Sequence, residues 1–316
     1  MGEYMNHSGR EGNPWSIVLS GGEGRRLAPF IREMFGTERP KQYCAFTGRR
    51  TMLEHTLDRA ARFSGPQRVV TVIDNGHWGW IDEPRRLFIP GRIVAQPDAR
   101  ETGPGILFPL SYVLAEDPDA TVAILPSDHF IKPDAAFDAE LKRAATIAAA
   151  LPDRICLVAA RPDRPEEDYG WIEPGEWVVG SGLCARTVRK FVEKPSAREA
   201  SRMNQAGWLW NTMIMVGRAK AFRDLARAVQ PELAYRFEAL TEAIRLGRDA
   251  EVLPEVYQDL PSVNFSKEML GRAPERLVAL PMAGALYWCD WGREERVQAT
   301  LKWLKLAPTF EREAAI

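Results

Sequence analysis

The sequence predicts an α/β fold: a mixed, mainly parallel sheet with helices on both faces and an inserted hairpin region. Three observations predict it. Short apolar runs alternate with longer helix-like segments through the first half of the chain. These runs are apolar throughout, as expected for strands buried between two layers of helices. Beyond residue 161, prolines and glycines interrupt short extended pieces, which favours hairpins.

The individual elements follow from local pattern. Apolar runs ended by a polar residue, glycine or proline predict strands at 15–20, 68–73, 92–95, 121–125 and 155–160. Helical patterns cover 51–63, 104–115, 134–150, 196–205, 219–229 and 233–246. Thr51 and Glu54 form the pattern of a capping box, and Asp134 is expected to cap its helix.

The length and composition of the chain limit the number of domains it can form. The chain has 316 residues, of which 45% are hydrophobic and 27% charged, as in globular proteins. We expect 14–307 to form a single domain, 1–13 a disordered arm and 308–316 a tail. The first residues lack the apolar stretch of a signal peptide.

Charge and cysteine content exclude several classes of function. The net charge of −1 gives no overall field for nucleic acid or a membrane surface. No apolar run approaches the roughly 18 residues of a membrane span. The four cysteines form no C-x-x-C pair, which argues against a zinc site or a disulfide framework and favours a cytoplasmic location. The sequence does not decide between a monomer and a homo-oligomer.

A glycine-rich turn follows the first predicted strand. Glycines let main-chain N–H groups approach a phosphate closely, and the two arginines after them add forked donors. The residues of this turn are Ser20, Gly21, Gly22, Gly24, Arg25 and Arg26. A dinucleotide fingerprint would need a third glycine where Leu27 stands, and the G-K-[ST] of a P-loop is absent. Taken alone, the stretch is equally compatible with an ordinary turn.

The glycine turn is also the first of several segments that together resemble one known family. GGEGRRLAPF, followed by Pro40-Lys41-Gln42, resembles the opening signature of sugar-1-phosphate nucleotidyltransferases, and most of all that of mannose-1-phosphate guanylyltransferases. Further segments resemble that family in the same order: QPDARETGPG at 96–105, LPSDHFI at 125–131, DYGWIEPG at 168–175, FVEKP at 191–195, WLWNTMIMV at 208–216 and YWCDWG at 287–292.

The resemblance implies a Rossmann-like fold of the GT-A type and transfer of a nucleotidyl group to a sugar 1-phosphate. It implies GTP and mannose 1-phosphate as substrates and Mg²⁺ as cofactor. Asp128 and Asp290 match its metal ligands. The implied catalytic residues are Arg26, Lys41, Asp128, Lys194 and Asp290. His129 lies beside Asp128, but this reaction needs no general base, so a structural or orienting role is expected for it.

The resemblance also implies which residues contact the two substrates. The resemblance implies that the nucleotide is contacted by the turn residues Ser20 to Arg25 and by Gln96, Arg100, Thr102 and Ser127. It implies that the sugar is contacted by Gly170, Glu193 and Asn211, and that the inserted hairpin region forms this sugar site. A surface role beside Asp98 is the alternative for Arg100. Matched segments are flanked by Trp208, Trp210, Trp288 and Trp291. A place in the core or at the rim is the favoured interpretation for each, and stacking on sugar or base is the alternative.

The sequence departs from the family pattern at several positions, so it does not decide which nucleotide and which sugar are the substrates. Arg25 replaces a threonine, Gln96 a glutamate, Glu101 an asparagine and Met213 a glycine. The loop between Pro29 and Pro40 is longer than usual, and we expect it to act as a lid or to alter nucleotide access. We expect the resemblance to cover the catalytic domain alone, without the further domain that often follows in the family. The alternatives are the same chemistry with UTP, dTTP or another sugar, or a non-catalytic, sugar-nucleotide-binding regulatory subunit.

Overall fold

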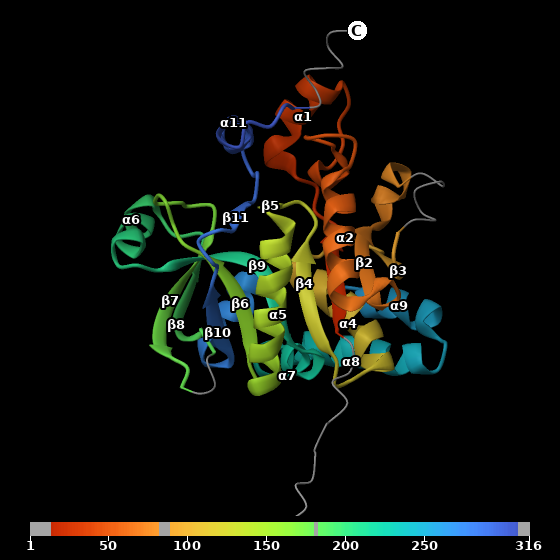
Figure 1. The fold of residues 1–316 in the computed structure, drawn as a ribbon. Helices are drawn as coiled ribbons and strands as arrows, with labels where there is room; N and C mark the ends of the chain where they lie inside the picture. The colour runs from red at the N-terminus through yellow and green to blue at the C-terminus, as the bar shows by residue number, and fades with distance from the viewer. Residues whose placement is uncertain (1–13, 82–88, 180–182, 309–316) are drawn as a thin grey trace, which may run out of the picture.

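A nine-stranded sheet forms the centre of the computed structural model, which describes residues 14–81, 89–179 and 183–308 (Figure 1). The strand order is β3-β2-β1-β4-β9-β6-β10-β8-β7. The strands are β1 (Trp15–Ser20), β2 (Val69–Asp74), β3 (Arg92–Gln96), β4 (Thr121–Pro126), β6 (Ile155–Ala160), β7 (Gly170–Trp177), β8 (Arg186–Glu193), β9 (Leu209–Arg218) and β10 (Leu277–Pro281). A separate two-stranded sheet pairs β5 (Phe130–Lys132) with β11 (Tyr287–Cys289).

The sheet was predicted to be mainly parallel. Most of its strands do run in one direction, but most pairings between neighbouring strands are antiparallel. β8 and β9 run against the other seven strands. Because each reversed strand has neighbours on both sides, the nine pairings divide into four parallel and five antiparallel ones. β7 and β8 form the predicted hairpin, and it continues the edge of the main sheet.

Helices cover both faces of the sheet, as predicted, and each face has its own apolar core (Figure 1). Helices α2 (Met52–Ser64) and α5 (Asp134–Ala150) pack on one face. Helices α4 (Thr102–Glu116), α7 (Ala219–Val229) and α8 (Pro231–Arg245) pack on the other. Neighbours along β1 divide between the two cores, Ile17 in one and Val18 in the other, because successive strand side chains point to opposite faces.

Local sequence sets several helix ends. Thr51 and Glu54 form the predicted capping box at α2. A second box joins Ser196 and Glu199 at α6 (Ala197–Gln205). The prediction for Asp134 was wrong, because Pro133 is the N-cap residue of α5 and no side chain caps that helix.

The segment after the glycine turn was predicted as a loop, but most of it is helical. Pro29 stands in the first turn of α1 (Ala28–Phe35), where a missing N–H costs nothing, and Gly36 ends the helix in a left-handed conformation. The fold also contains α9 (Asp249–Tyr257), α10 (Phe265–Glu268) and α11 (Glu294–Trp303), which the sequence patterns did not predict. They did not predict β5, β9 or β10 either. α1, β5, β11 and α11 lie together above one end of the sheet (Figure 1).

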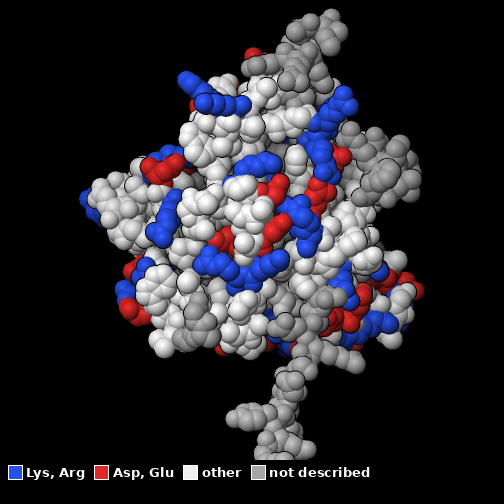
Figure 2. Space-filling model, in the orientation of Figure 1, with Lys and Arg blue, Asp and Glu red and all other residues white. Residues whose placement is uncertain are grey.

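Acidic and basic side chains alternate on the visible surface (Figure 2). Between α2 and α5, for example, Arg62 Nε lies 2.8 Å from Asp138 Oδ2. This mixture fits the near-zero net charge. Across the described ranges, no helix is both long enough and apolar enough to span a membrane. The predicted arm at 1–13 and residues 309–316 of the predicted tail lie outside those ranges.

Candidate active site

The candidate site begins where β1 and β4 end side by side. Ser127 follows β4, and its N–H donates to the carbonyl oxygen of Leu19 in β1 (3.0 Å). The hydroxyls of Ser20 and Ser127 are buried and have no hydrogen-bond partner among the described residues. Because buried polar groups are nearly always paired, two unpaired hydroxyls at the ends of neighbouring strands mark this edge of the sheet as a candidate site.

Lys41 joins three segments at this point. Its side chain is buried, only 5% exposed, and Nζ lies 3.0 Å from Asp128 Oδ2. The same nitrogen donates to the main-chain oxygen of Asp290, and to that of Trp291 (3.3 Å). Gly24 lies against it, in a left-handed conformation with φ 63°. Lys41 therefore fixes the ends of β4 and β11 relative to the glycine turn.

Asp128 and His129 are oriented by neighbours. Burial raises the pKa of Asp128, but attraction to Lys41 and His129 outweighs it, so the pKa lies below its ordinary value. Trp288 Nε1, which can only donate, lies 3.1 Å from His129 Nδ1. In neutral His129 the proton is then on Nε2, which faces Asp128 Oδ1 at 3.7 Å. Burial lowers the pKa of His129, so the neutral form dominates at pH 7. Trp288 and Asp128 thus lie on opposite sides of the His129 ring and fix its orientation.

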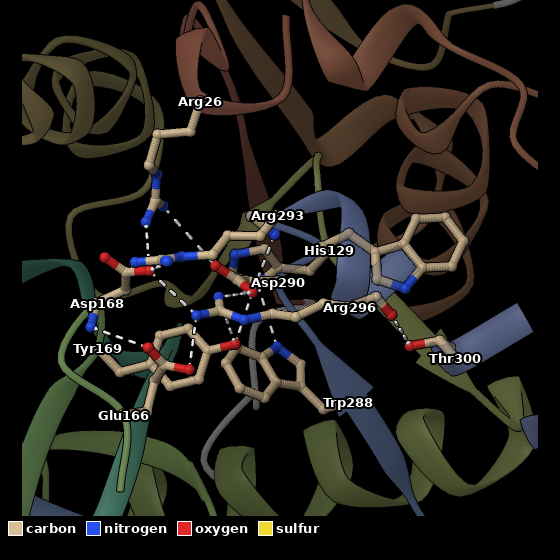
Figure 3. A network of polar contacts seen from close by, with 12 residues as sticks. Arg26, His129, Glu166, Asp168, Tyr169, Trp288, Asp290, Arg293, Arg296 and Thr300 are labelled. Atoms are coloured by element: carbon tan, nitrogen blue, oxygen red, sulfur yellow. Dashed lines mark hydrogen bonds and ion pairs between the residues drawn. The ribbon is translucent and has the colours of Figure 1, made fainter. Parts of the chain in front are cut away.

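Asp290 is held by three donors on one oxygen (Figure 3). Its Oδ1 accepts from the Tyr169 hydroxyl (2.6 Å), Arg296 Nη1 (2.8 Å) and the Gly292 N–H (3.1 Å). Burial opposes ionisation, yet Lys41, Arg296 and the Tyr169 hydroxyl lower the pKa of Asp290 to about 2. The side chain is therefore an oriented carboxylate at neutral pH.

The two arginines of the glycine turn point to different places. Arg26 reaches Asp168 Oδ2 (3.0 Å) and lies 3.9 Å from Asp290 Oδ2 (Figure 3). Arg25 is exposed and pairs with Glu23. The structure thus brings Arg26 to the carboxylates and leaves Arg25 outside that cluster.

The carboxylates of Asp128 and Asp290 are too few to bind Mg²⁺ by themselves, so phosphate oxygens of a substrate would have to complete its coordination shell. Among the described residues, no group of three or more His, Cys, Asp or Glu side chains could hold a metal ion. Mg²⁺, however, commonly binds one or two carboxylates and completes its shell with phosphate oxygens and water. Each aspartate retains one oxygen without a close ion pair: neutral His129 Nε2 lies 3.7 Å from Asp128 Oδ1, and Arg26 Nη2 lies 3.9 Å from Asp290 Oδ2. The residues therefore fit a metal that arrives with a phosphate ligand.

The predicted sugar-binding residues meet at the start of β7 and the end of β8. A Cβ added to Gly170 would lie 2.7 Å from Glu193 Oε2 and 3.1 Å from Asn211 Cβ. That Glu193 oxygen is buried and has no hydrogen-bond partner among the described residues. Burial raises the pKa of Glu193 to about 7, although nearby Lys194 opposes the shift. The Lys194 side chain is exposed.

Predicted nucleotide-binding residues are more dispersed. Gln96 is buried, and its Nε2 would lie 3.0 Å from a Cβ added to Gly21. Arg100 pairs with Asp98 (2.7 Å), the alternative raised for it. Thr102 accepts a hydrogen bond from the Phe265 N–H (2.8 Å). Of these three residues, Gln96 lies against the glycine turn, whereas Arg100 and Thr102 contact other segments.

Strained backbone gathers in the same segments. Within the described ranges, six non-glycine residues have positive φ: Glu101, Lys194, Met213, Asp259, Trp291 and Lys305. The first three and Trp291 lie in segments that carry the family resemblance. Such conformations cost about 1–3 kcal/mol each and cluster at functional sites. Met213, which replaces a glycine of the family pattern, has φ 58°, a conformation glycine adopts without strain.

Four polar side chains around Asp290 were not among the predicted site residues. Arg296 lies close to Glu166, Asp168 and Tyr169 as well as Asp290 (Figure 3). The sequence contained one usable signal, since Arg293 and Arg296 are two basic residues close behind the matched YWCDWG segment. Both contact Asp168, at 2.7 and 3.1 Å.

The tryptophans near the site are largely buried, as favoured from the sequence. Trp291 is 1% exposed and stacks on Phe130, with ring centroids 4.5 Å apart. Trp210 and Trp288 pack against Tyr169. Trp208 is half-buried. Their rings thus support the polar side chains of the site.

Comparisons with known proteins agree on one family. A sequence profile for the family described as "Nucleotidyl transferase" matches residues 15–299. "Xanthan biosynthesis protein XanB" of Xanthomonas campestris pv. campestris is 30% identical over 279 residues, covering 87% of this chain and 57% of that protein. "Mannose-1-phosphate guanylyltransferase 2" of Escherichia coli O157:H7 is 27% identical over 286 residues, covering 88% of this chain and 58% of that protein. The chain thus spans little more than half the length of these relatives.

A solved structure shows the same fold. It is described as a mannose-1-phosphate geranyltransferase from Thermus thermophilus and superposes with a TM-score of 0.76 at 27% identity. The superposition covers 91% of this chain and 79% of that one.

Proposed function

The chain belongs to the nucleotidyl transferase family, and on that premise we propose that it transfers a nucleotidyl group from a nucleoside triphosphate to a sugar 1-phosphate, releasing pyrophosphate. GTP and mannose 1-phosphate are the proposed pair, and GDP-mannose is the proposed product. Their support is the name of a relative, a mannose-1-phosphate guanylyltransferase, and the resemblance of the sequence segments.

One observation carries the proposal: a buried lysine and two carboxylates converge at the strand-end glycine turn. Lys41 contacts the Asp128 carboxylate and the main chain of Asp290. Ligands in open α/β sheets bind at this edge. The chemistry of the site is that of polyanion binding, with a fixed cation for phosphate oxygens and two carboxylates for a metal.

The reaction we propose is an in-line substitution at phosphorus. A phosphate oxygen of the sugar 1-phosphate forms a bond to the α-phosphorus of the triphosphate. The bond from that phosphorus to the oxygen bridging to the β-phosphate breaks, and pyrophosphate leaves. The attacking phosphate has a second pKa of about 6, so it is already mostly a dianion at neutral pH. No general base is needed, which fits a neutral, orienting His129.

Charge repulsion is the main obstacle that the residues must overcome. Two unit charges 4 Å apart repel by about 4 kcal/mol at an effective dielectric of about 20, and two phosphate compounds bring several such pairs together. We propose that Lys41 and Arg26 neutralise the triphosphate and the leaving pyrophosphate. Lys194 would bind the sugar phosphate, and Glu193 and Asn211 would bind sugar hydroxyls. Asp128 and Asp290 would hold Mg²⁺, which supplies further charge neutralisation when bound.

A pyrophosphate-release screen tests the proposal. Purified protein is incubated with each of GTP, UTP, dTTP, CTP and ATP against a panel of sugar 1-phosphates, with Mg²⁺ or with a chelator. We expect release with GTP and mannose 1-phosphate that depends on Mg²⁺. Preference for UTP or dTTP would overturn the proposed base, and preference for another sugar the proposed acceptor. No release with any pair would overturn the transferase function and favour a regulatory, sugar-nucleotide-binding role.

A further inference from the structure

We propose that Arg296 is a positioning residue: it orients Asp290 so that Oδ2 faces the metal and the nucleotide, and it links this carboxylate to the sugar side of the site. The proposal rests on the function proposed above. It concerns a residue of α11 that lies outside the segments carrying the family resemblance.

The Arg296 side chain is only 9% exposed and is surrounded by acceptors (Figure 3). Nη1 donates to Asp290 Oδ1 (2.8 Å) and to the Tyr169 hydroxyl oxygen (3.2 Å). Nη2 lies 2.6 Å from Glu166 Oε2 and 3.1 Å from Asp168 Oδ2. The guanidinium carbon lies 4.8 Å from the centre of the Tyr169 ring. One planar group thus contacts both the aspartate and the segment before β7.

These contacts decide which oxygen of Asp290 is available. Oδ1 already accepts from Arg296, Tyr169 and the Gly292 N–H, which fixes the plane of the carboxylate. Oδ2 receives no such bond and faces Arg26 at 3.9 Å. A ligand carboxylate held by its neighbours binds metal better than a freely rotating one, and loss of such a neighbour commonly costs about 10–100-fold in metal affinity or activity.

The same contacts couple the two halves of the site. Tyr169 precedes Gly170, against which Glu193 and Asn211 pack. Arg296 holds Tyr169 and Asp290 together through their shared hydrogen bonds. A lysine could not reproduce this arrangement, because its ammonium group lacks the planar fork that serves several acceptors at once. Removal of the guanidinium would also leave Glu166, Asp168 and Asp290 without the cation they share.

The test uses the full chain with Arg296→Met and Arg296→Lys. Arg62→Met is the matched control, because Arg62 also forms two contacts with one carboxylate, that of Asp138, but between α2 and α5. Pyrophosphate release is measured against Mg²⁺ concentration. Mn²⁺ binding is measured by calorimetry, with and without a non-hydrolysable GTP analogue, and thermal unfolding reports on the fold.

We expect Arg296→Met to raise the Mg²⁺ concentration for half-maximal rate and the Mn²⁺ dissociation constant by roughly tenfold or more, with partial recovery in Arg296→Lys. Arg62→Met should leave both unchanged. Unchanged metal dependence in folded Arg296→Met would overturn the proposal. Should that variant fail to fold, a folded Arg296→Lys with unaltered metal dependence would overturn it. If the wild type releases no pyrophosphate with any pair, the proposed function fails, and the Mn²⁺ titrations still decide the role of Arg296.

Discussion

The ammonium nitrogen of Lys41 lies 3.0 Å from Asp128 Oδ2, and the same nitrogen donates to the main-chain oxygen of Asp290. A lysine buried this deeply needs acceptors on several sides, since an unpaired charge in the interior is strongly unfavourable. The contact therefore fixes where the two aspartates lie relative to the glycine turn.

Lys41→Met should lower kcat by roughly 100-fold or more, because loss of one preorganised electrostatic contact to the reacting groups has effects of that size. The measurement is pyrophosphate release at saturating substrates, with thermal unfolding as a check on the fold. Lys220→Met is the control, because Lys220 forms a similar ion pair with Asp119 at the surface (2.6 Å). A folded Lys41→Met with normal kcat would contradict the assigned role.

Asp128→Asn and Asp290→Asn should each reduce Mg²⁺-dependent turnover by roughly 100-fold or more, since the charge stabilisation supplied by a bound metal is worth several kcal/mol. Circular dichroism should show folded protein in both cases. Asp119→Asn removes a surface carboxylate and should be silent. Full activity in either site variant would remove that residue from the set of metal ligands.

Glu193 should make stability depend on pH in an unusual direction. Its pKa is raised from 4.5 to about 7 by burial, against Lys194 and together with repulsion from Glu101. Between these values the unfolded carboxyl is ionised while the folded one keeps its proton, so the free energy of unfolding falls as the pH rises through this range. Glu193→Gln removes that penalty. Relative to wild type, we expect it to gain about 1–3 kcal/mol between about pH 4.5 and about pH 8.

Urea unfolding of the wild type and Glu193→Gln at both pH values measures this difference. A stability difference that does not change between the two conditions would show that Glu193 titrates normally in the folded protein.

Gly170→Ala should weaken sugar binding more than nucleotide binding. The new Cβ would lie 2.7 Å from Glu193 Oε2 and 2.9 Å from Phe191 Cζ, so one of these groups must move. We expect KM for the sugar 1-phosphate to rise roughly tenfold or more, because small displacements of positioning groups have effects of that order. Gly284→Ala is the control, because a Cβ there meets nothing within 4 Å. Equal changes in both KM values would argue against a sugar-specific role.

Sequence patterns predicted the elements whose cause is local. The bounds of β1 and β6 follow from apolar runs ended by a polar or turn-forming residue. The start of α2 follows from the Thr51–Glu54 pattern, in which both partners lie within one turn. β9 was not predicted, because Asn211, Thr212 and Gly217 interrupt its apolar pattern; pairing with β4 and β6 supplies what the local signal lacks.

Contacts between distant residues account for what the sequence did not predict at the site. Asp134 has the pattern of a cap but pairs with Arg59, 75 positions away. Arg296 looks like a surface residue of a short helix, yet it bonds Tyr169, 127 positions away. Motif resemblance named Lys41, Asp128 and Asp290 as candidates, and the structure adds how their neighbours orient them. Their roles in turnover remain predictions.

The long sequence separation between the parts of the site has a consequence for the order of events during biosynthesis. Lys41 and Asp290 are separated by 249 positions, so a chain emerging from the ribosome presents its glycine turn long before its second aspartate. Such a nascent chain lacks the carboxylate that we propose completes the metal site. Metal and nucleotide should therefore bind only after β11 and α11 have docked, and their binding energy would stabilise finished molecules over incomplete ones.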